Sequence, residues 1–236
     1  MKNVVLAVIG SKGKVSIDFA ASLNRTAAMA AEKGVYIHFD YVDEFTSGVS
    51  TSLQKNIIAN RVLGSKTADA LFFINPNLSW LPQDFFTLTE YSGDGIISGA
   101  YVDSFREIES YAIRLSNYDD VMDGLSKADF FSMGFVYIPK KVLQGLTQFV
   151  EKLGDDEDNE AFYLFFKETV KNNLVFQEDH YFCDIVKTSG FDLLVDPTVN
   201  CTNNALVSLR TDYLDYLKRS WVGKMGEENA KDMTQN

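Results

Sequence analysis

Two pairs of polar side chains in this sequence have types and spacing suited to chemistry. Asn75 and Asn77 flank Pro76 directly after an apolar run, and Glu178 and Asp179 open a segment with a helical pattern. Amide oxygens accept hydrogen bonds, and a carboxylate can also take a proton as a general base. The sequence therefore predicts a binding or transfer site wherever the fold brings the two pairs together.

The elements that must position these pairs follow a regular order. Residues 70–74 form an apolar run of strand length, typical of a strand buried on both faces of a sheet. Residues 4–10 and 35–40 are further strands, and residues 15–33 and 51–64 have helical patterns that end near glycine. This β-α-β-α-β order predicts a doubly wound parallel sheet whose carboxyl edge, at residues 10–14, 40–44 and 75–77, binds a ligand.

The rest of the chain reads as one continuing α/β domain over residues 1–220. Further helices are expected at residues 82–91, 140–153, 161–171 and 177–186, and further strands at residues 95–101, 111–115, 130–139 and 191–197. The polar residues 221–236 are expected to fray.

Composition excludes several classes of function. The formal net charge of -11 over 236 residues argues against a long nucleic-acid footprint, which needs clustered Lys and Arg. Two cysteines and two histidines are too few for a disulfide framework or a histidine-rich metal centre. No apolar run approaches the roughly 18 residues of a membrane span, and the chain enters a strand at once. We therefore expect a soluble, cytoplasmic protein without a signal peptide.

Some local features have two interpretations. Gly10, Gly13 and Lys14 invite a phosphate-loop interpretation, but the residue after Lys14 is not the Ser or Thr that such a loop requires, which favours a flexible turn. Lys55 and Arg61 lie about 240 degrees apart on a helix, so each is expected to be an ordinary solvated cation. His38 is expected to pack in the core. The acidic residues 154–160 favour a solvated loop over a metal-binding loop.

The order and spacing of several segments are similar to those of a known family. These segments are residues 55–56, 72–80, 97–101, 133–140, 178–183 and 190–197. Together they resemble a GT-A-fold glycosyltransferase of the family-two-like type found in bacteria, phages and large viruses, over about residues 3 to 205. The resemblance implies a mixed, mostly parallel Rossmann-like sheet with helices on both faces.

The resemblance also implies a cofactor, and here the sequence departs from the family. Family members end the organising strand in Asp-x-Asp, whose carboxylates hold manganese or magnesium against the donor diphosphate. This chain has Asn75 and Asn77 instead, and residues 196–203 lack the histidine that completes the metal site in many relatives. Amide oxygens bring no negative charge, so these two residues are expected to hold a divalent cation far more weakly than the two aspartates of the family would.

The family's other site residues carry over position by position. The resemblance implies that one carboxylate of the Glu178-Asp179 pair is the general base of an inverting displacement, and it favours Asp179 over Glu178. The alternative role of both residues is to cap the start of the helix. The implied acceptor contacts are Gly134 and His180. The implied donor contacts are Gly10, Lys12, Asp40, Lys55, Asn75, Asn77 and Trp80.

Three functions remain open from the sequence. The chain could transfer a sugar from a nucleotide-sugar donor to a glycan or other hydroxyl acceptor, with Lys12, Lys14 or Lys55 supplying the charge of the missing metal. It could instead be a noncatalytic relative that binds a nucleotide, a glycan or a protein. It could also be a nucleotidyltransferase or another doubly wound binding module that shares only the sheet.

Overall fold

A computed structural model describes residues 1–10, 14–42, 48–105, 109–116, 124–154, 161–171, 173–204 and 213. The polar tail expected at residues 221–236 lies outside these residues, as do Lys12 and most of the acidic run at residues 154–160. None of the helices in the described ranges is long and apolar enough to cross a lipid bilayer.

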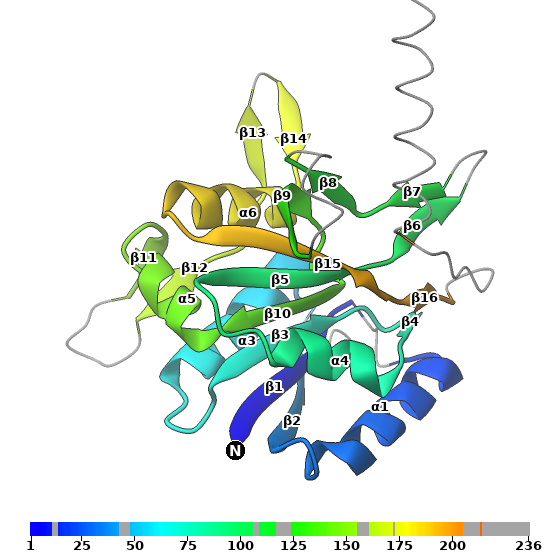
Figure 1. The fold of residues 1–236 in the computed structure, drawn as a ribbon. Helices are drawn as coiled ribbons and strands as arrows, with labels where there is room; N and C mark the ends of the chain where they lie inside the picture. Colours follow the sequence, from blue (N-terminus) through cyan, green and yellow to red (C-terminus); the bar gives the residue numbers. More distant parts are fainter. Residues whose placement is uncertain are drawn as a thin grey trace, which may run out of the picture.

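An eight-stranded mixed sheet organises the fold (Figure 1). Strands β10 and β9 run opposite to the other six. In spatial order the strands are β2 (Val35–Tyr41), β1 (Lys2–Val8), β3 (Ala70–Ile74), β10 (Phe135–Pro139), β5 (Gly95–Ala100), β15 (Asp192–Asn200), β9 (Ser126–Phe131) and β8 (Ile113–Leu115). The mixed, mostly parallel sheet of GT-A type predicted from the sequence is confirmed.

Helices cover both faces of this sheet, as expected (Figure 1). One face carries α3 (Thr51–Gly64), α5 (Lys140–Leu146) and α6 (Glu178–Thr188), and the other carries α1 (Ile17–Ala30) and α4 (Pro82–Thr89). Strand β3 is buried throughout, with Leu71 and Phe73 in one core cluster and Phe72 and Ile74 in the other. Alternate side chains of a central strand thus build both halves of the core.

Four short two-stranded ladders complete the described part of the chain. They are β4 (Leu78–Ser79) with β16 (Thr202–Asn203), β6 (Val102–Phe105) with β7 (Glu109–Tyr111), β11 (Glu151–Leu153) with β12 (Phe162–Leu164), and β13 (Thr169–Lys171) with β14 (Leu174–Phe176).

The parallel strands end together at the edge that the sequence predicted to bind a ligand. Val8 of β1 lies opposite both Tyr41 of β2 and Ile74 of β3. Gly10 and Asn75 therefore leave the sheet side by side, because each follows its strand by one or two residues.

Three predicted elements are wrong. The strand expected at residues 130–139 is interrupted at residues 132–134, so β9 pairs with β15 while β10 lies between β3 and β5. The helix expected at residues 140–153 ends at Leu146 and is followed by β11. The helix expected at residues 161–171 is instead β12 and β13.

Asparagines of α3 explain why residues 161–171 stay extended. Asn56 donates a hydrogen bond to the Phe166 carbonyl at 2.7 Å and accepts one from the Phe166 N–H at 2.9 Å. Asn60, one turn later, makes the same pair of bonds with Tyr163 at 2.8 and 2.9 Å. These side chains satisfy backbone groups that a helix would otherwise pair internally.

Candidate functional site

A polar cleft of about 250 Å³ lies at the carboxyl edge of β1 and β3. The first turns of α3 and α6 and the turn at residues 132–134 form its other walls. Its lining residues are Ile9, Gly10, Thr51, Lys55, Asn75, Pro76, Asn77, Tyr101, Ser132, Met133, Gly134, Gln177, Glu178 and Asp179. The structure therefore brings together the two pairs of polar residues that the sequence singled out.

A tight turn holds the two strand-end asparagines. The Asn75 N–H donates to the Gly134 carbonyl at 2.8 Å, and the Asn77 N–H donates to the Asn75 side-chain oxygen at 2.9 Å. This second bond is typical of an asparagine that folds the backbone after itself. The amide oxygen of Asn75 thus shapes the turn, while Asn77 is exposed at the rim.

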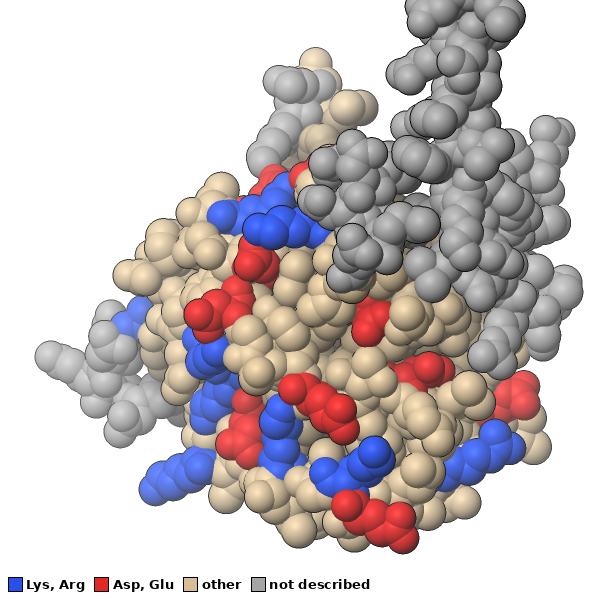
Figure 2. All heavy atoms as spheres, in the orientation of Figure 1, with Lys and Arg blue, Asp and Glu red and all other residues tan. Residues whose placement is uncertain are grey.

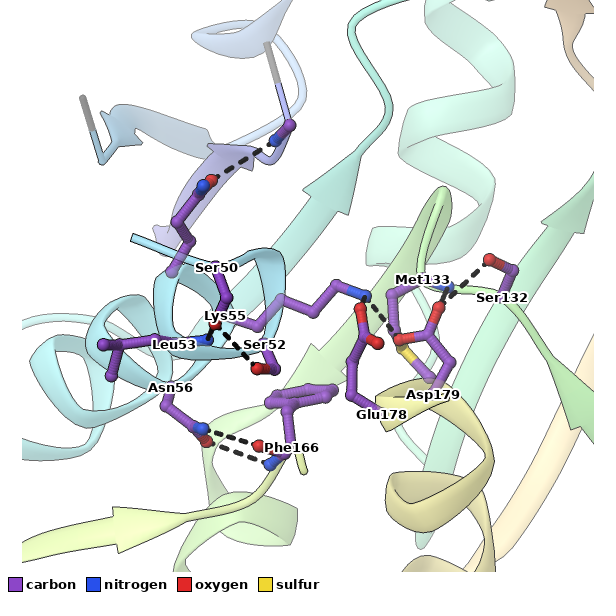
Figure 3. A network of polar contacts seen from close by, with 12 residues as sticks. Ser50, Ser52, Leu53, Lys55, Asn56, Ser132, Met133, Phe166, Glu178 and Asp179 are labelled. Carbon is purple, nitrogen blue, oxygen red and sulfur yellow. Dashed lines mark hydrogen bonds and ion pairs between the residues drawn. The ribbon is translucent and has the colours of Figure 1, made fainter. Parts of the chain in front are cut away.

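Lys55 forms a buried ion triad with the two carboxylates (Figure 3). Its ammonium nitrogen lies 2.8 Å from Glu178 Oε1 and 2.5 Å from Asp179 Oδ1, and the residue is only 5% exposed. The prediction of a solvated cation at Lys55 is wrong. Arg61, by contrast, has a mostly exposed side chain that pairs with Asp40 at 2.8 Å.

The second oxygen of Asp179 ties α6 to the turn between β9 and β10. Asp179 Oδ2 accepts hydrogen bonds from the Ser132 hydroxyl and from the Met133 N–H, both at 3.0 Å (Figure 3). Asp179 belongs to α6 and contacts both α3 and this turn, so it connects three walls of the cleft.

Local sequence explains why the triad forms at two helix starts. Ser50 caps α3 by accepting a hydrogen bond from the Leu53 N–H at 3.3 Å, so Thr51 and Lys55, four residues apart, face the cleft together. Gln177 precedes α6 without a side-chain cap, and the acids in its first turn are stabilised by the helix dipole.

The residues present do not fit the divalent cation that the resemblance implies. The Asn75 amide oxygen is taken by the turn, and Lys55 already provides the positive charge beside both carboxylates. Within the described ranges, no group of three or more His, Cys, Asp or Glu side chains is placed to hold a metal ion. Hard cations need several oxygen ligands with net negative charge, so we assign no step to a cation.

The other predicted donor contacts do not all reach the cleft. Gly10 lines it, with a φ of 71° that favours glycine, and its N–H donates to Gln54 Oε1 at 3.3 Å. Asp40 is not among the lining residues of the cleft and pairs with Arg61 instead. Trp80 is buried in the core, where its ring packs on Phe19 and its N–H donates to Thr26 at 3.0 Å. Lys12 lies outside the described residues.

The two predicted acceptor contacts are also placed differently. Gly134 lines the cleft, whereas His180 stacks on Phe130 with ring centroids 3.8 Å apart and is not among the lining residues. Burial in this aromatic stack, and then the nearby Arg114, lower the pKa of His180. His38, which the sequence placed in the core, is exposed on β2.

Several lining residues were missed by sequence reasoning, among them Tyr101, Ser132 and Met133. The one sequence signal for this wall was Gly134, a glycine within an apolar run, since a glycine in a strand can mark the close approach of another group. A Cβ on Gly134 would lie 2.2 Å from the Tyr101 hydroxyl oxygen, so this close contact shapes the cleft wall.

Gly134→Ala is expected to destabilise the protein by about 1–3 kcal/mol, because the new methyl group must displace the buried Tyr101 ring. Urea unfolding measures this cost. Gly64→Ala is the matched control, since a Cβ there meets no atom within 4 Å. Equal stability of the two variants would contradict the close contact.

The face seen in Figure 2 carries basic and acidic side chains intermixed. Ion pairs such as Lys141 with Asp94 at 2.6 Å and Lys127 with Asp192 at 2.9 Å join exposed residues of opposite charge. Pairing of this kind neutralises these cations locally.

No protein-family model and no curated protein sequence matches the chain. Among solved structures, A197 from STIV is 13% identical, with 86% of this chain and 85% of that chain covered and a TM-score of 0.50. A Drosophila β-1,4-galactosyltransferase 7 variant, solved with manganese, UDP-Gal and xylobiose, is 11% identical over 88% and 68% of the two chains (TM-score 0.46). The inositol-1-phosphate CTP transferase from T. maritima is 9% identical over 83% and 85% (TM-score 0.42).

At these identities the likeness is one of fold alone. The strand order, the helices on both faces and the cleft at the carboxyl edge define a GT-A-like α/β protein.

Proposed function

We propose that this chain is a glycosyltransferase that moves a sugar from a nucleotide-sugar donor to an acceptor hydroxyl with inversion, without the usual metal site. The single observation that carries the proposal is the joint position of Asn75, Asn77 and the Lys55 triad around one polar cleft. That cleft lies where open α/β sheets bind ligands, and the sequence resemblance supplies the reaction class.

In this proposal the chain's own residues divide the work of transfer. A carboxylate of the Glu178-Asp179 pair takes the proton of the acceptor hydroxyl. The donor lies along the edge formed by the Gly10 backbone and the Asn75–Asn77 turn. The positive charge of Lys55 stabilises the charge that develops on the leaving diphosphate, and Lys12 and Lys14 are the further cations that the sequence offers for this role.

One observation favours the alternative of a noncatalytic protein that binds a nucleotide, a glycan or a protein partner. Lys55 is already neutralised by two carboxylates, and both strand-end positions carry uncharged amides. A site whose charged groups are already paired with one another can hold a ligand by hydrogen bonds without stabilising a leaving group.

Thermal unfolding with nucleotides and nucleotide sugars tests the proposal. We expect UDP-glucose, UDP-N-acetylglucosamine or GDP-mannose to raise the Tm equally with manganese and with EDTA. Ligand at 100 times its Kd stabilises a native state by about 2.7 kcal/mol, or about 5–10 °C in Tm for a chain of this size.

Asn77→Asp serves as the matched variant, since it returns one carboxylate to the rim. The rise in Tm that a nucleotide sugar causes in this variant is expected to depend on manganese. A wild-type shift that needs manganese would contradict the metal-independent site, and no shift with any of these probes would favour the partner-binding alternative.

A further inference from the structure

We propose that Glu178 is the carboxylate that receives the acceptor proton and that Asp179 is a positioning residue that holds the cleft together. This assignment rests on the proposed function. It reverses the order of the two residues that the sequence resemblance implies, and it follows from how differently their oxygens are occupied.

Both oxygens of Asp179 are already engaged. Oδ1 lies 2.5 Å from the Lys55 ammonium, and Oδ2 accepts hydrogen bonds from Ser132 Oγ and Met133 N at 3.0 Å each. Proton transfer to either oxygen would break a charge-assisted bond or give up two hydrogen bonds in a buried place. Asp179 is therefore suited to fixing geometry, and poorly suited to taking a proton in each cycle.

The carboxylate oxygens of Glu178 are less occupied than those of Asp179. Glu178 Oε1 lies 2.8 Å from Lys55, and among the described residues Oε2 has no recorded hydrogen-bond partner. Glu178 lines the cleft beside Asn75 and Asn77, so its free oxygen can meet a hydroxyl that enters there. Lys55 holds the other oxygen and thereby orients the carboxylate.

Adjacent positions on a helix explain the division. Consecutive residues point about 100 degrees apart, so the first turn of α6 directs Asp179 toward the turn at residues 132–134 while Glu178 faces Lys55 from another side (Figure 3). In the proposed transfer step, each bond that forms is matched by a bond that breaks. Glu178 Oε2 takes the hydroxyl proton as the acceptor oxygen bonds to the sugar's anomeric carbon, and the bond to the diphosphate breaks with its electron pair on the nucleotide.

Glu178→Gln and Asp179→Asn form a matched pair, because each removes one negative charge from the same triad without changing shape. The assay follows release of UDP or GDP from UDP-glucose, UDP-N-acetylglucosamine and GDP-mannose across pH. We expect Glu178→Gln to lower kcat about 10²–10⁴-fold with unchanged donor KM and to abolish the acid limb of the pH profile. Asp179→Asn is expected to keep that limb and to lose less kcat.

Ser132→Ala gives a milder probe that needs no change in the triad. Its hydroxyl contacts Asp179 Oδ2, so we expect a several-fold loss of kcat with the acid limb unmoved. An acid limb that disappears in Asp179→Asn and persists in Glu178→Gln would overturn the assignment.

A readout without turnover separates this inference from the proposed function. Asp179→Asn is expected to lower the Tm by at least twice as much as Glu178→Gln, because it weakens three contacts rather than one. An equal or reversed order overturns the positioning role. If wild-type protein releases no nucleotide from any probe while the Tm order holds, the proposed transfer and the role of Glu178 fail, and the positioning role of Asp179 stands.

Discussion

Replacing Lys55 by methionine is expected to destabilise the protein by about 3–5 kcal/mol, because it leaves two buried carboxylates without their counter-ion. Glu178 and Asp179 both lie within 2.8 Å of the Lys55 ammonium, and their side chains are only 13% and 10% exposed. Methionine keeps the length of the side chain beside the Phe166 ring, so the loss reports charge rather than a cavity.

Urea unfolding at pH 7 measures this loss, with Lys141→Met as the control. Lys141 pairs with Asp94 at 2.6 Å, but both side chains are at least half exposed, so we expect a cost below about 1 kcal/mol. Adding Glu178→Gln and Asp179→Asn to the Lys55 variant is expected to recover stability, because no uncompensated charge then remains. Similar losses for Lys55→Met and Lys141→Met would show that the triad is not the buried charge cluster described above.

The part of the site that the sequence predicted is the part set by strand ends. Residues 70–74 and 51–64 match β3 and α3, because a continuous apolar run and a segment between a Ser or Thr N-cap and a glycine stop are local signals. Parallel strands end at one edge, so Gly10 and Asn75 could be placed together without knowing any side-chain contact. The expected position of the cleft, at the carboxyl edge of the sheet, followed from these two facts.

The sequence could not predict contacts between distant residues. A helical wheel places Lys55 and Arg61 on different sides of their helix, whereas the partners of Lys55 lie 123 and 124 residues further along the chain. Trp80 lies close to Asn77 in the sequence, yet its ring turns into the core against Phe19. Polarity and spacing along a chain do not say which partner will bury a charge or which ring will fill a gap.

The segment at residues 161–171 shows the same limit for secondary structure. Its apolar residues Phe162, Leu164, Phe165 and Phe166 fit a helical face, but Asn56 and Asn60 of α3 bond its backbone in an extended form. Tertiary hydrogen bonds outweigh a local helical pattern here, because each buried backbone group must find a partner.

Asn56→Ala is expected to destabilise the protein by about 2–4 kcal/mol, because it removes the partner of two buried backbone groups at once. The Asn56 side chain is the donor to the Phe166 carbonyl at 2.7 Å and the acceptor from the Phe166 N–H at 2.9 Å, 110 residues away in the chain (Figure 3). Phe166 packs on Phe182 of α6 with ring centroids 4.4 Å apart, so loosening it also loosens the helix that carries Glu178 and Asp179.

Asn60→Ala provides the comparison for this prediction, since Asn60 makes the same two bonds to Tyr163 in a partly exposed setting. Water can replace part of what Asn60 provides, so we expect a smaller cost in urea unfolding, about 1 kcal/mol. The Asn56 variant should also speed amide exchange at Phe166 while the Asn60 variant leaves it unchanged. Equal costs for the two variants, or protection of the Phe166 amide in Asn56→Ala, would mean that packing of the aromatic rings alone keeps this segment extended.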